Sequence, residues 1–249
     1  MEFTKLLCIF LLLQLSFASA YRGRIIGGEE CPENGHPWLV LLYVYDSNEL
    51  LCAGMLLNHN WVLTAAHCYI RGKIQLRFGA HNTDAYEQLR ISADTKCPND
   101  DCFHFTDDIM LIKLNSSVAD SERVATIPLP TTCAQVGANC TVMGWGTTTT
   151  PEETYPNIPY CIDIEIFDNQ VCQAAYPWEV TNKMFCAGDL EGGKDSCRGD
   201  SGGPLVCDGG LQGIVSLGGF PCGEPFEPGI YTKICMYLDW IQSTMEEST

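Results

Sequence analysis

The sequence predicts an all-β protein built from antiparallel strands. Along its 249 residues, short runs of apolar, β-branched and aromatic side chains recur, and clusters of Gly, Pro, Asn and Asp separate them. No long stretch has the period of an amphipathic helix before the end of the chain. Many short strands without intervening helices are typical of a barrel or a sandwich. With 46% hydrophobic residues, the chain can form a real core, which excludes a disordered protein.

The strands can be located in order. The run from Trp38 to Leu57 is broken by Asp46-Ser47-Asn48, which predicts a hairpin. The further predicted strands are Trp61–Leu63, Ile74–Phe78, Ile109–Leu114, Thr141–Trp145, Ile162–Phe167, Leu205–Cys207, Gly213–Leu217 and Gly229–Ile234. Near the end, Met236, Trp240 and Ile241 share one helical face, which predicts a terminal helix that lies on a barrel.

The first twenty residues are typical of a signal peptide. Lys5 is basic, Leu6–Leu15 is an apolar run too short to span a bilayer, and Ala18-Ser19-Ala20 has the small residues that signal peptidase accepts. No later apolar run approaches membrane length. We therefore expect a secreted, extracellular protein.

The cysteines and the charge limit the class of protein further. Of fifteen cysteines, Cys8 leaves with the signal peptide, and the remaining even number predicts seven disulfides, with the pairing left open. The net charge of −17 excludes binding to nucleic acid and to anionic membranes. The acidic surface either favours cationic partners or simply keeps a secreted protein in solution.

Three polar positions could form a nucleophilic site. In Gly199–Pro204, glycines bracket Ser201, so its hydroxyl can stand clear of the backbone, although a tight turn with a solvated serine has the same pattern. His67 follows a predicted strand and Asp108 precedes another, and each alone is typical of an ordinary structural residue. Together they supply a nucleophile, a base and an orienting acid.

A short basic segment, Tyr21-Arg22-Gly23-Arg24, precedes Ile25-Ile26-Gly27-Gly28. Cleavage after Arg24 would create a new amino terminus at Ile25. The segment is either a cleavable propeptide or an exposed linker, and these residues alone do not distinguish the two.

Six motifs together resemble the chymotrypsin-like (trypsin) family of serine endopeptidases, in the order and at the approximate spacing of that family. They are Ile25–Gly28, Thr64–Cys68, Asp108–Leu114, Gly144–Gly146, Gly199–Pro204 and Gly229–Thr232. Within the family, Thr154–Cys161, Val171–Pro177 and Leu190–Asp195 look most similar to glandular kallikreins and reptile venom serine proteases.

The resemblance implies a domain organisation. It implies two six-stranded antiparallel barrels with the active site between them. The signal peptide would span residues 1–20, the activation propeptide 21–24 and the peptidase domain 25–249. Within that domain, the barrels would lie at about 25–130 and 131–235, and the terminal helix at about 236–245.

The resemblance also implies roles for the motif residues. His67 is similar to the general base, Asp108 to its orienting acid and Ser201 to the nucleophile; we choose Asp108 over Asp107 because it directly adjoins the Ile-Met-Leu strand. The N–H groups of Gly199 and Ser201 would form the oxyanion hole. After cleavage at Arg24, the amine of Ile25 would pair with Asp200, which makes the basic segment a zymogen latch.

Substrate preference is implied by the residues around Asp195. An acid at this position lies at the bottom of the primary pocket in the family and accepts Arg, or less readily Lys. Ser196 adjoins it, Gly218 and Gly229 would keep the pocket open, and Ser216-Leu217-Gly218 would offer backbone to the substrate as an added strand.

The sequence departs from the family pattern in several places. Leu217 stands where an aromatic residue is usual, and Phe105 would narrow the subsite next to His67. Arg198, at the edge of the cleft, would either select acidic substrate residues or be solvated. Gly79–Arg90 is shorter than the calcium loop of trypsins and Ala80 replaces its first acidic ligand, so we expect no calcium dependence, no metal and no cofactor.

Covalent features follow from the same resemblance. Six bridges match trypsin, and the two cysteines left over would pair locally. The implied pairs are Cys31–Cys161, Cys52–Cys68, Cys133–Cys235, Cys140–Cys207, Cys172–Cys186, Cys197–Cys222 and Cys97–Cys102. Asn115 begins a plausible glycosylation sequon, whereas the sequon at Asn139 contains a cysteine that is implied to be bridged.

The leading hypothesis is a secreted endopeptidase, made as a zymogen, that cleaves after Arg in plasma proteins such as kininogen or fibrinogen, as a venom toxin would. We expect a monomer whose partners are such substrates and protein protease inhibitors. A broad digestive trypsin is the alternative within the family. A catalytically silent homologue used only for binding is the alternative from another class.

Overall fold

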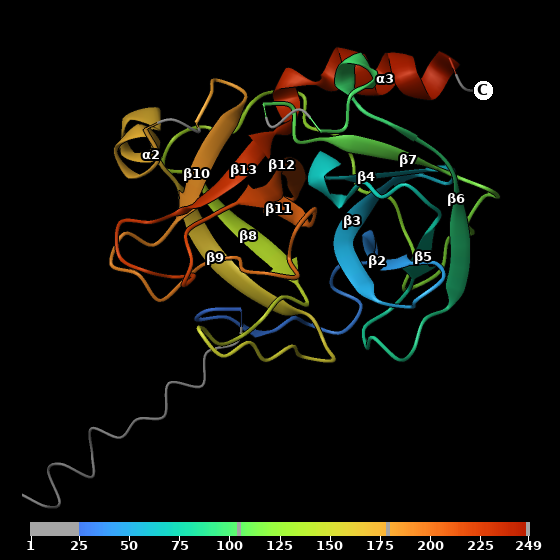
Figure 1. The fold of residues 1–249 in the computed structure, drawn as a ribbon, viewed down its shortest axis with the longest axis horizontal. Coiled ribbons are helices and arrows are strands. Elements are labelled where there is room, and N and C mark those ends of the chain that lie inside the picture. Colours follow the sequence, from blue (N-terminus) through green and yellow to red (C-terminus); the bar gives the residue numbers. More distant parts are fainter. Residues whose placement is uncertain (1–24, 104–105, 178–179, 248–249) are drawn as a thin grey trace, which may run out of the picture.

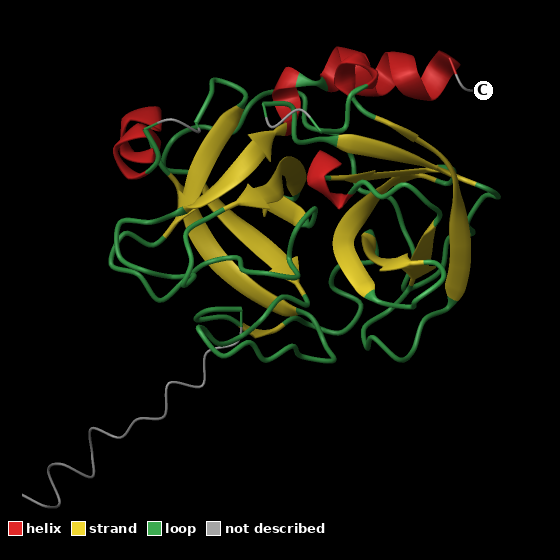
Figure 2. Ribbon diagram, in the orientation of Figure 1, coloured by secondary structure: helices red, strands yellow, loops and turns green. Residues whose placement is uncertain are grey.

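The computed structural model describes residues 25–103, 106–177 and 180–247. The predicted signal peptide, the residues around Arg24 and the residue Phe105 lie outside this described part. The described chain forms two closed antiparallel β-barrels that lie side by side, as expected (Figures 1 and 2).

The first barrel closes in the strand order β2-β3-β4-β7-β6-β5. Its strands are β2 (Leu39–Val44), β3 (Leu50–Asn58), β4 (Trp61–Thr64), β5 (Ile74–Phe78), β6 (Gln88–Lys96) and β7 (Met110–Leu114). The predicted hairpin is β2 and β3. Strand β6 has no counterpart among the predicted strands, because only two of its residues, Leu89 and Ile91, are large and apolar.

The second barrel has the same order of strands, β8-β9-β10-β13-β12-β11, and β8 pairs with β9 to close it. These strands are β8 (Asn139–Gly144), β9 (Tyr160–Ile166), β10 (Met184–Gly188), β11 (Pro204–Cys207), β12 (Gly210–Leu217) and β13 (Gly229–Lys233). The two-residue strand β1 (Glu29–Glu30) pairs with the outer side of β9. Neither β1 nor β10 was predicted.

The helices differ in part from the expectation. Helix α3 (Leu238–Glu247) ends the described chain and buries Ile241 against the first barrel (Figure 1). Met236 lies before this helix, in the 3-10 turn η3 (Ile234–Met236), and is exposed, so its predicted place on the buried face is wrong. Helix α2 (Asn169–Ala175) was missed, since seven residues are too few to show a period; Asp168 caps it by accepting the N–H of Gln170. The other 3-10 turns are η1 (Ala66–Cys68) and η2 (Pro98–Asp100).

Strand β2 is apolar on both faces because it serves two cores. Val40 and Leu42 point into the first barrel. Leu39, Leu41 and Tyr43 point the other way and pack with Met143 and Trp145 of the second barrel. This second contact fixes one barrel against the other and thereby positions the loops that meet between them.

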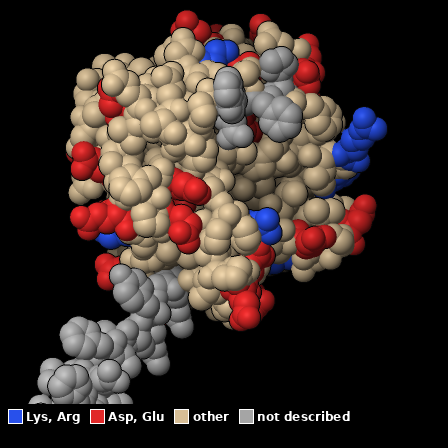
Figure 3. Space-filling view, turned by 60° about the vertical axis from the view of Figure 1, so that its left-hand side comes forward, with Lys and Arg blue, Asp and Glu red and all other residues tan. Residues whose placement is uncertain are grey.

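The structure contains the seven disulfides that the resemblance implied. Cys31–Cys161 and Cys133–Cys235 join segments that are 130 and 102 residues apart. Asp and Glu side chains cover more of the surface drawn in Figure 3 than Lys and Arg do, in keeping with the net charge of −17.

Candidate functional site

His67 is held at the barrel interface by a short, anchored turn. The turn η1 follows β4, and its other two residues, Ala66 and Cys68, are buried. Cys68 is also bonded to Cys52 of β3. The imidazole itself remains 35% exposed. A rigid turn therefore presents a solvent-accessible ring.

Asp108 precedes β7 and holds both the ring and the backbone of His67. One carboxylate oxygen accepts the His67 N–H at 2.9 Å, and the other lies 2.8 Å from Nδ1. The hydroxyl of Ser216 donates to the same oxygen, and Thr232 Oγ1 donates to the Asp108 carbonyl at 2.7 Å. Burial raises the pKa of Asp108, but its hydrogen bonds and the charge of His67 outweigh burial and leave the pKa below its ordinary value.

Ser201 lies in the loop before β11, which folds against the first barrel. Its carbonyl accepts the N–H of Ala53 at 2.9 Å. Gly202 packs so closely that a Cβ would lie 2.1 Å from Thr64 Oγ1 and 3.2 Å from the Ala65 nitrogen. Since Ala65 is two residues before His67, the structure brings the predicted nucleophile and base to the same place.

Gly199 has a φ of +96°, a conformation that L side chains rarely adopt. Within the described part of the chain, its N–H and that of Ser201 donate to no other backbone group. Neither N–H group is therefore occupied by a backbone acceptor of the described chain.

Asp200 points away from Ser201 into the second barrel. It is completely buried and accepts N–H groups from Gly146 at 2.8 Å and Cys197 at 3.0 Å. Any Cβ at Gly144 or Gly146 would lie within 2.3 Å of this carboxylate, which explains the Gly-Trp-Gly motif. Burial raises the pKa of Asp200 to about 6, because these hydrogen bonds offset only part of the desolvation.

Ile25 and Ile26 dock beside this region. The Ile25 side chain is buried in the core of the second barrel. Ile26 forms a bridge with Asp195, whose N–H donates to the Ile26 carbonyl at 3.2 Å. The segment after the predicted cleavage site is therefore packed against the loops that carry Asp195 and Asp200.

Asp195 is a buried acid with half of its carboxylate unused. It is only 1% exposed, and Oδ2 accepts the Gly223 N–H at 3.1 Å. Among the described residues, Oδ1 has no hydrogen-bond partner. Burial raises the pKa of Asp195 to about 7. A buried carboxylate that has no cationic partner among the described residues is poised to receive a cation.

Some of the residues around Asp195 were predicted from the sequence, and others were missed. Ser196 lies beside it, with its hydroxyl 3.0 Å from that of buried Tyr231. Gly229 passes so near that a Cβ would lie 2.9 Å from Asp195 Oδ1, whereas the nearest atom to a Cβ at Gly218 is 3.8 Å away. Sequence reasoning missed Gly223 and Tyr231, which carry no signal of their own except their places near Cys222 and Gly229.

Two further surface features lie near the loop that carries Ser201. Leu217 is exposed next to buried Ser216 at the end of β12. A groove of about 630 Å³ adjoins Gly199. It is lined by both barrels, through Leu50 and Leu51 on one side and Tyr155 and Pro156 on the other.

The Arg198 side chain is held by a carboxylate and an aromatic ring of the protein. Its guanidinium lies 2.8 Å from Glu153 Oε1 and 4.4 Å from the centre of the Phe220 ring. Tyr155 donates to the other Glu153 oxygen at 2.7 Å. Sequence reasoning missed Glu153 because its distance of 45 residues from Arg198 leaves no local pattern.

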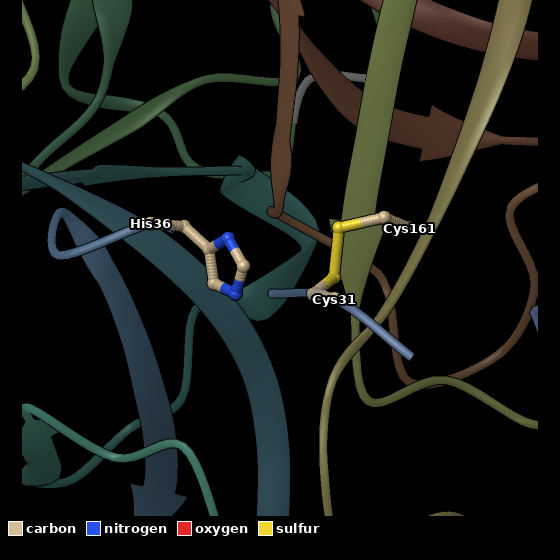
Figure 4. A group of neighbouring side chains, drawn as sticks. All are labelled: Cys31, His36 and Cys161. Atoms are coloured by element: carbon tan, nitrogen blue, oxygen red, sulfur yellow. A yellow bond between two sulfur atoms is a disulfide. The ribbon is translucent and has the colours of Figure 1, made fainter. Parts of the chain in front are cut away.

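Two groups of Cys and His side chains cluster closely enough to suggest metal binding. In one, His36 lies beside Cys31 and Cys161 (Figure 4); the other contains Cys52, His67 and Cys68. In both groups the sulfur atoms are already bonded to each other as disulfides. A thiolate is the form that binds a metal, so these groups do not fit one.

Comparisons with known proteins agree with this geometry. The family model described as Trypsin matches residues 25–241. The snake venom serine protease NaSP of Naja atra is 53% identical over 223 residues, covering 88% of this chain and 78% of that protein. The alpha- and beta-fibrinogenase OhS1 of Ophiophagus hannah is 50% identical over 254 residues, covering 100% and 96%.

Two further similarities extend the comparison. The venom plasminogen activator TSV-PA of Trimeresurus stejnegeri is 48% identical over 251 residues, covering 98% of this chain and 95% of that protein. The structure of neuropsin, a serine protease of mouse brain, superposes with a TM-score of 0.80 at 42% identity, covering 88% of this chain and 98% of that one. In the described part of the chain, no helix is long and apolar enough to cross a membrane.

Proposed function

The chain belongs to the trypsin family of serine proteases, and from this we propose that it is a secreted endopeptidase that cleaves plasma proteins after Arg, and less readily after Lys. The observation that carries the specificity is Asp195, a buried acid whose Oδ1 has no partner among the described residues. The guanidinium fork of Arg would pair with this carboxylate and relieve the cost of its burial.

In the proposed reaction, His67 takes the hydroxyl proton of Ser201 while the serine oxygen attacks the substrate carbonyl. Asp108 holds the imidazole by Nδ1, at 2.8 Å, and stabilises its charged form. The N–H groups of Gly199 and Ser201 bind the oxyanion that forms. His67 then gives the proton to the leaving amine. A water molecule next attacks the acyl-enzyme while His67 takes its proton, and His67 returns the proton to Ser201 as the acid product leaves.

Activation is the second part of the proposal. Cleavage after Arg24 frees the amine of Ile25, which pairs with Asp200. Two observations support this: Asp200 is completely buried with only backbone partners among the described residues, and Ile25 is packed in the same barrel. Secretion follows from the predicted signal peptide. Asn115 is exposed after β7, which keeps it available for glycosylation.

The names of the fibrinogenase and the plasminogen activators support a venom role on plasma proteins. The negative net charge of the protein suits basic regions of such substrates. A broad digestive trypsin would catalyse the same reaction with a wider substrate specificity. Cleavage of a peptide library after nearly every Arg and Lys would overturn the narrow specificity that we propose.

The decisive test uses full-length protein cleaved after Arg24. We expect it to hydrolyse an Arg amide and to react with an organophosphate at Ser201. The variant Asp195→Ser should lose about 100-fold to 10,000-fold in kcat/KM on that amide, since breaking a buried ion pair costs about 3–5 kcal/mol. The same variant should still be labelled by the organophosphate.

Two outcomes would contradict the proposal. Without labelling and hydrolysis in the unaltered protein, the chain is a silent binding homologue. Undiminished Arg cleavage in Asp195→Ser shows that the pocket has been assigned to the wrong residue.

A further inference from the structure

Asp107, the residue before the proposed triad acid, is the centre of a second buried polar cluster. Its side chain is only 7% exposed. It forms an ion pair with Lys183 Nζ, and it accepts hydrogen bonds from the Tyr237 hydroxyl at 2.9 Å and from Thr106 Oγ1 at 3.3 Å. Sequence analysis gave Asp107 no role.

The cluster joins elements from both barrels. Asp107 lies before β7 of the first barrel, Lys183 lies before β10 of the second, and Tyr237 lies between η3 and α3. The backbone of Lys183 is fixed on both sides, because its N–H donates to Thr181 Oγ1 at 3.2 Å and its carbonyl accepts the Lys233 N–H at 2.8 Å. Its ammonium also lies 5.4 Å from the centre of the Tyr237 ring.

The two neighbouring carboxylates thus face different side chains. Asp108 faces His67 and the hydroxyl of Ser216, whereas Asp107 faces Lys183, Tyr237 and Thr106. Burial raises the pKa of Asp107, but the hydrogen bonds from Lys183 and Tyr237 outweigh burial and keep it below the ordinary value. Asp107 therefore carries a negative charge one residue from the triad acid.

We propose that Lys183 is a positioning residue for catalysis. It neutralises the charge of Asp107 across the barrel interface, so that one carboxylate charge, that of Asp108, acts electrostatically on His67 and not two. An uncompensated charge on Asp107 would favour the protonated form of His67, which cannot accept the proton of Ser201. The proposal rests on the role of His67 as base in the proposed function.

The alternative is a purely mechanical clasp between the barrels. A clasp predicts lower stability after its removal and no change in how His67 titrates. The electrostatic role predicts a change in titration that is reversed when the charge of Asp107 is also removed. These two outcomes can be separated by experiment.

The test compares Lys183→Met with Lys96→Met in the protein cleaved after Arg24. Lys96 is the matched control, because its side chain is 38% exposed against 39% for Lys183, and it also pairs with an aspartate, Asp94. Two measurements are made: the NMR titration of the His67 ring and the pH profile of kcat/KM on an Arg amide.

In Lys183→Met we expect the titration midpoint and the acidic limb of the profile to move upward by about half a pH unit, as one added charge nearby would produce. Lys96→Met should move neither. The double variant Asp107→Asn, Lys183→Met should restore both, and Lys183→Arg should behave as the unaltered protein does. If Lys183→Met does not fold, Lys183→Gln removes the same charge.

An unchanged midpoint in the folded Lys183 variant, or an equal shift in Lys96→Met, would overturn the inference. The NMR titration needs no catalytic turnover. Absence of hydrolysis in the unaltered protein would therefore count against the proposed function, while the titration would still decide the role of Lys183.

Discussion

Four buried aspartates have different partners, and the partner decides whether the pKa of each is raised or lowered. Asp107 and Asp108 face the cationic or ionisable side chains of Lys183 and His67, and their pKa values lie below the ordinary one. Asp195 and Asp200 have backbone donors and no cationic side chain among the described residues, and burial raises their pKa values to about 7 and about 6. The proposed function supplies a cation to each of the latter two acids: a substrate Arg pairs with Asp195, and the amine that cleavage frees on Ile25 pairs with Asp200.

The raised pKa of Asp195 predicts how binding of a cation depends on pH. In the proposed pocket, benzamidine, which is charged throughout this range, should bind only the ionised form of the Asp195 carboxylate. Above pH 7 its affinity should be constant. Below pH 7 protons compete for Asp195, and the affinity should fall by up to about tenfold per pH unit. Calorimetric titration between pH 5 and 9 measures this dependence.

Asp195→Asn is the control for this experiment, since it keeps the shape of the side chain and removes its charge. Its weak residual binding should show no break near pH 7. A break of equal size in this variant would assign the pH dependence to another group.

At the scale of the elements, an ion pair adds to the backbone contacts between the loop that joins β8 to β9 and the segment that carries Arg198. Glu153 of this loop holds Arg198, and the guanidinium also lies over Phe220. Since 62% of the Arg198 side chain is exposed, solvent screens this pair, and it should contribute little to stability. In the proposed function, the larger effect of the pair would be to neutralise the charge of Arg198 beside the substrate.

Glu153→Gln should therefore alter specificity and leave stability nearly unchanged. With its charge released, Arg198 should favour substrates that carry Asp or Glu after the cleaved bond. We expect kcat/KM for such peptides to rise about twofold to fivefold over the matched Gln and Asn peptides, as one exposed charge pair allows.

Competition between acidic and amide peptides in one reaction measures this ratio. In Arg198→Gln the preference should vanish whether Glu153 is present or not. If the ratio rises in Glu153→Gln and also in the double variant, Arg198 is not the residue responsible.

The elements differ in how far the sequence could predict them. Strands with long apolar runs, such as β2 and β7, were predicted because both of their faces are largely buried. Strand β10 was missed although it is wholly buried, since three of its five residues are Cys, Ala and Gly. The predicted site residues lie in recognisable motifs. Glu153, Lys183 and Gly223 were missed because tertiary contacts alone bring them to the site.

For the whole molecule, the two barrels share one strand order although the sequence shows no internal repeat. Their interface combines the packing of β2 on Trp145, the disulfide Cys31–Cys161 and the contact of the Ser201 loop with β3 and the end of β4. The stability of this interface and the geometry of the site are therefore linked. His36 is a titratable group at this interface, beside that disulfide (Figure 4).

The lowered pKa of His36 predicts that the free energy of unfolding falls in acid. Burial, and next the neighbouring His81, lower the pKa of His36 to about 4, and its Nε2 has no hydrogen-bond partner among the described residues. The unfolded chain takes up this proton near pH 6.5 and the folded chain only near pH 4. The contribution of His36 to stability is thus complete above pH 6.5 and is lost as the pH falls toward 4.

Urea unfolding with the disulfides intact, at pH 7.5 and pH 5, tests this in His36→Gln. We expect the drop in unfolding free energy between the two pH values to be smaller by about 1 kcal/mol than in the unaltered protein, a figure reduced to allow for partial exposure of the ring. His59→Gln removes a surface histidine that pairs with Asp120 and serves as the control for loss of a histidine. An identical drop in all three proteins would assign acid sensitivity to other groups, with the buried acids as the next candidates.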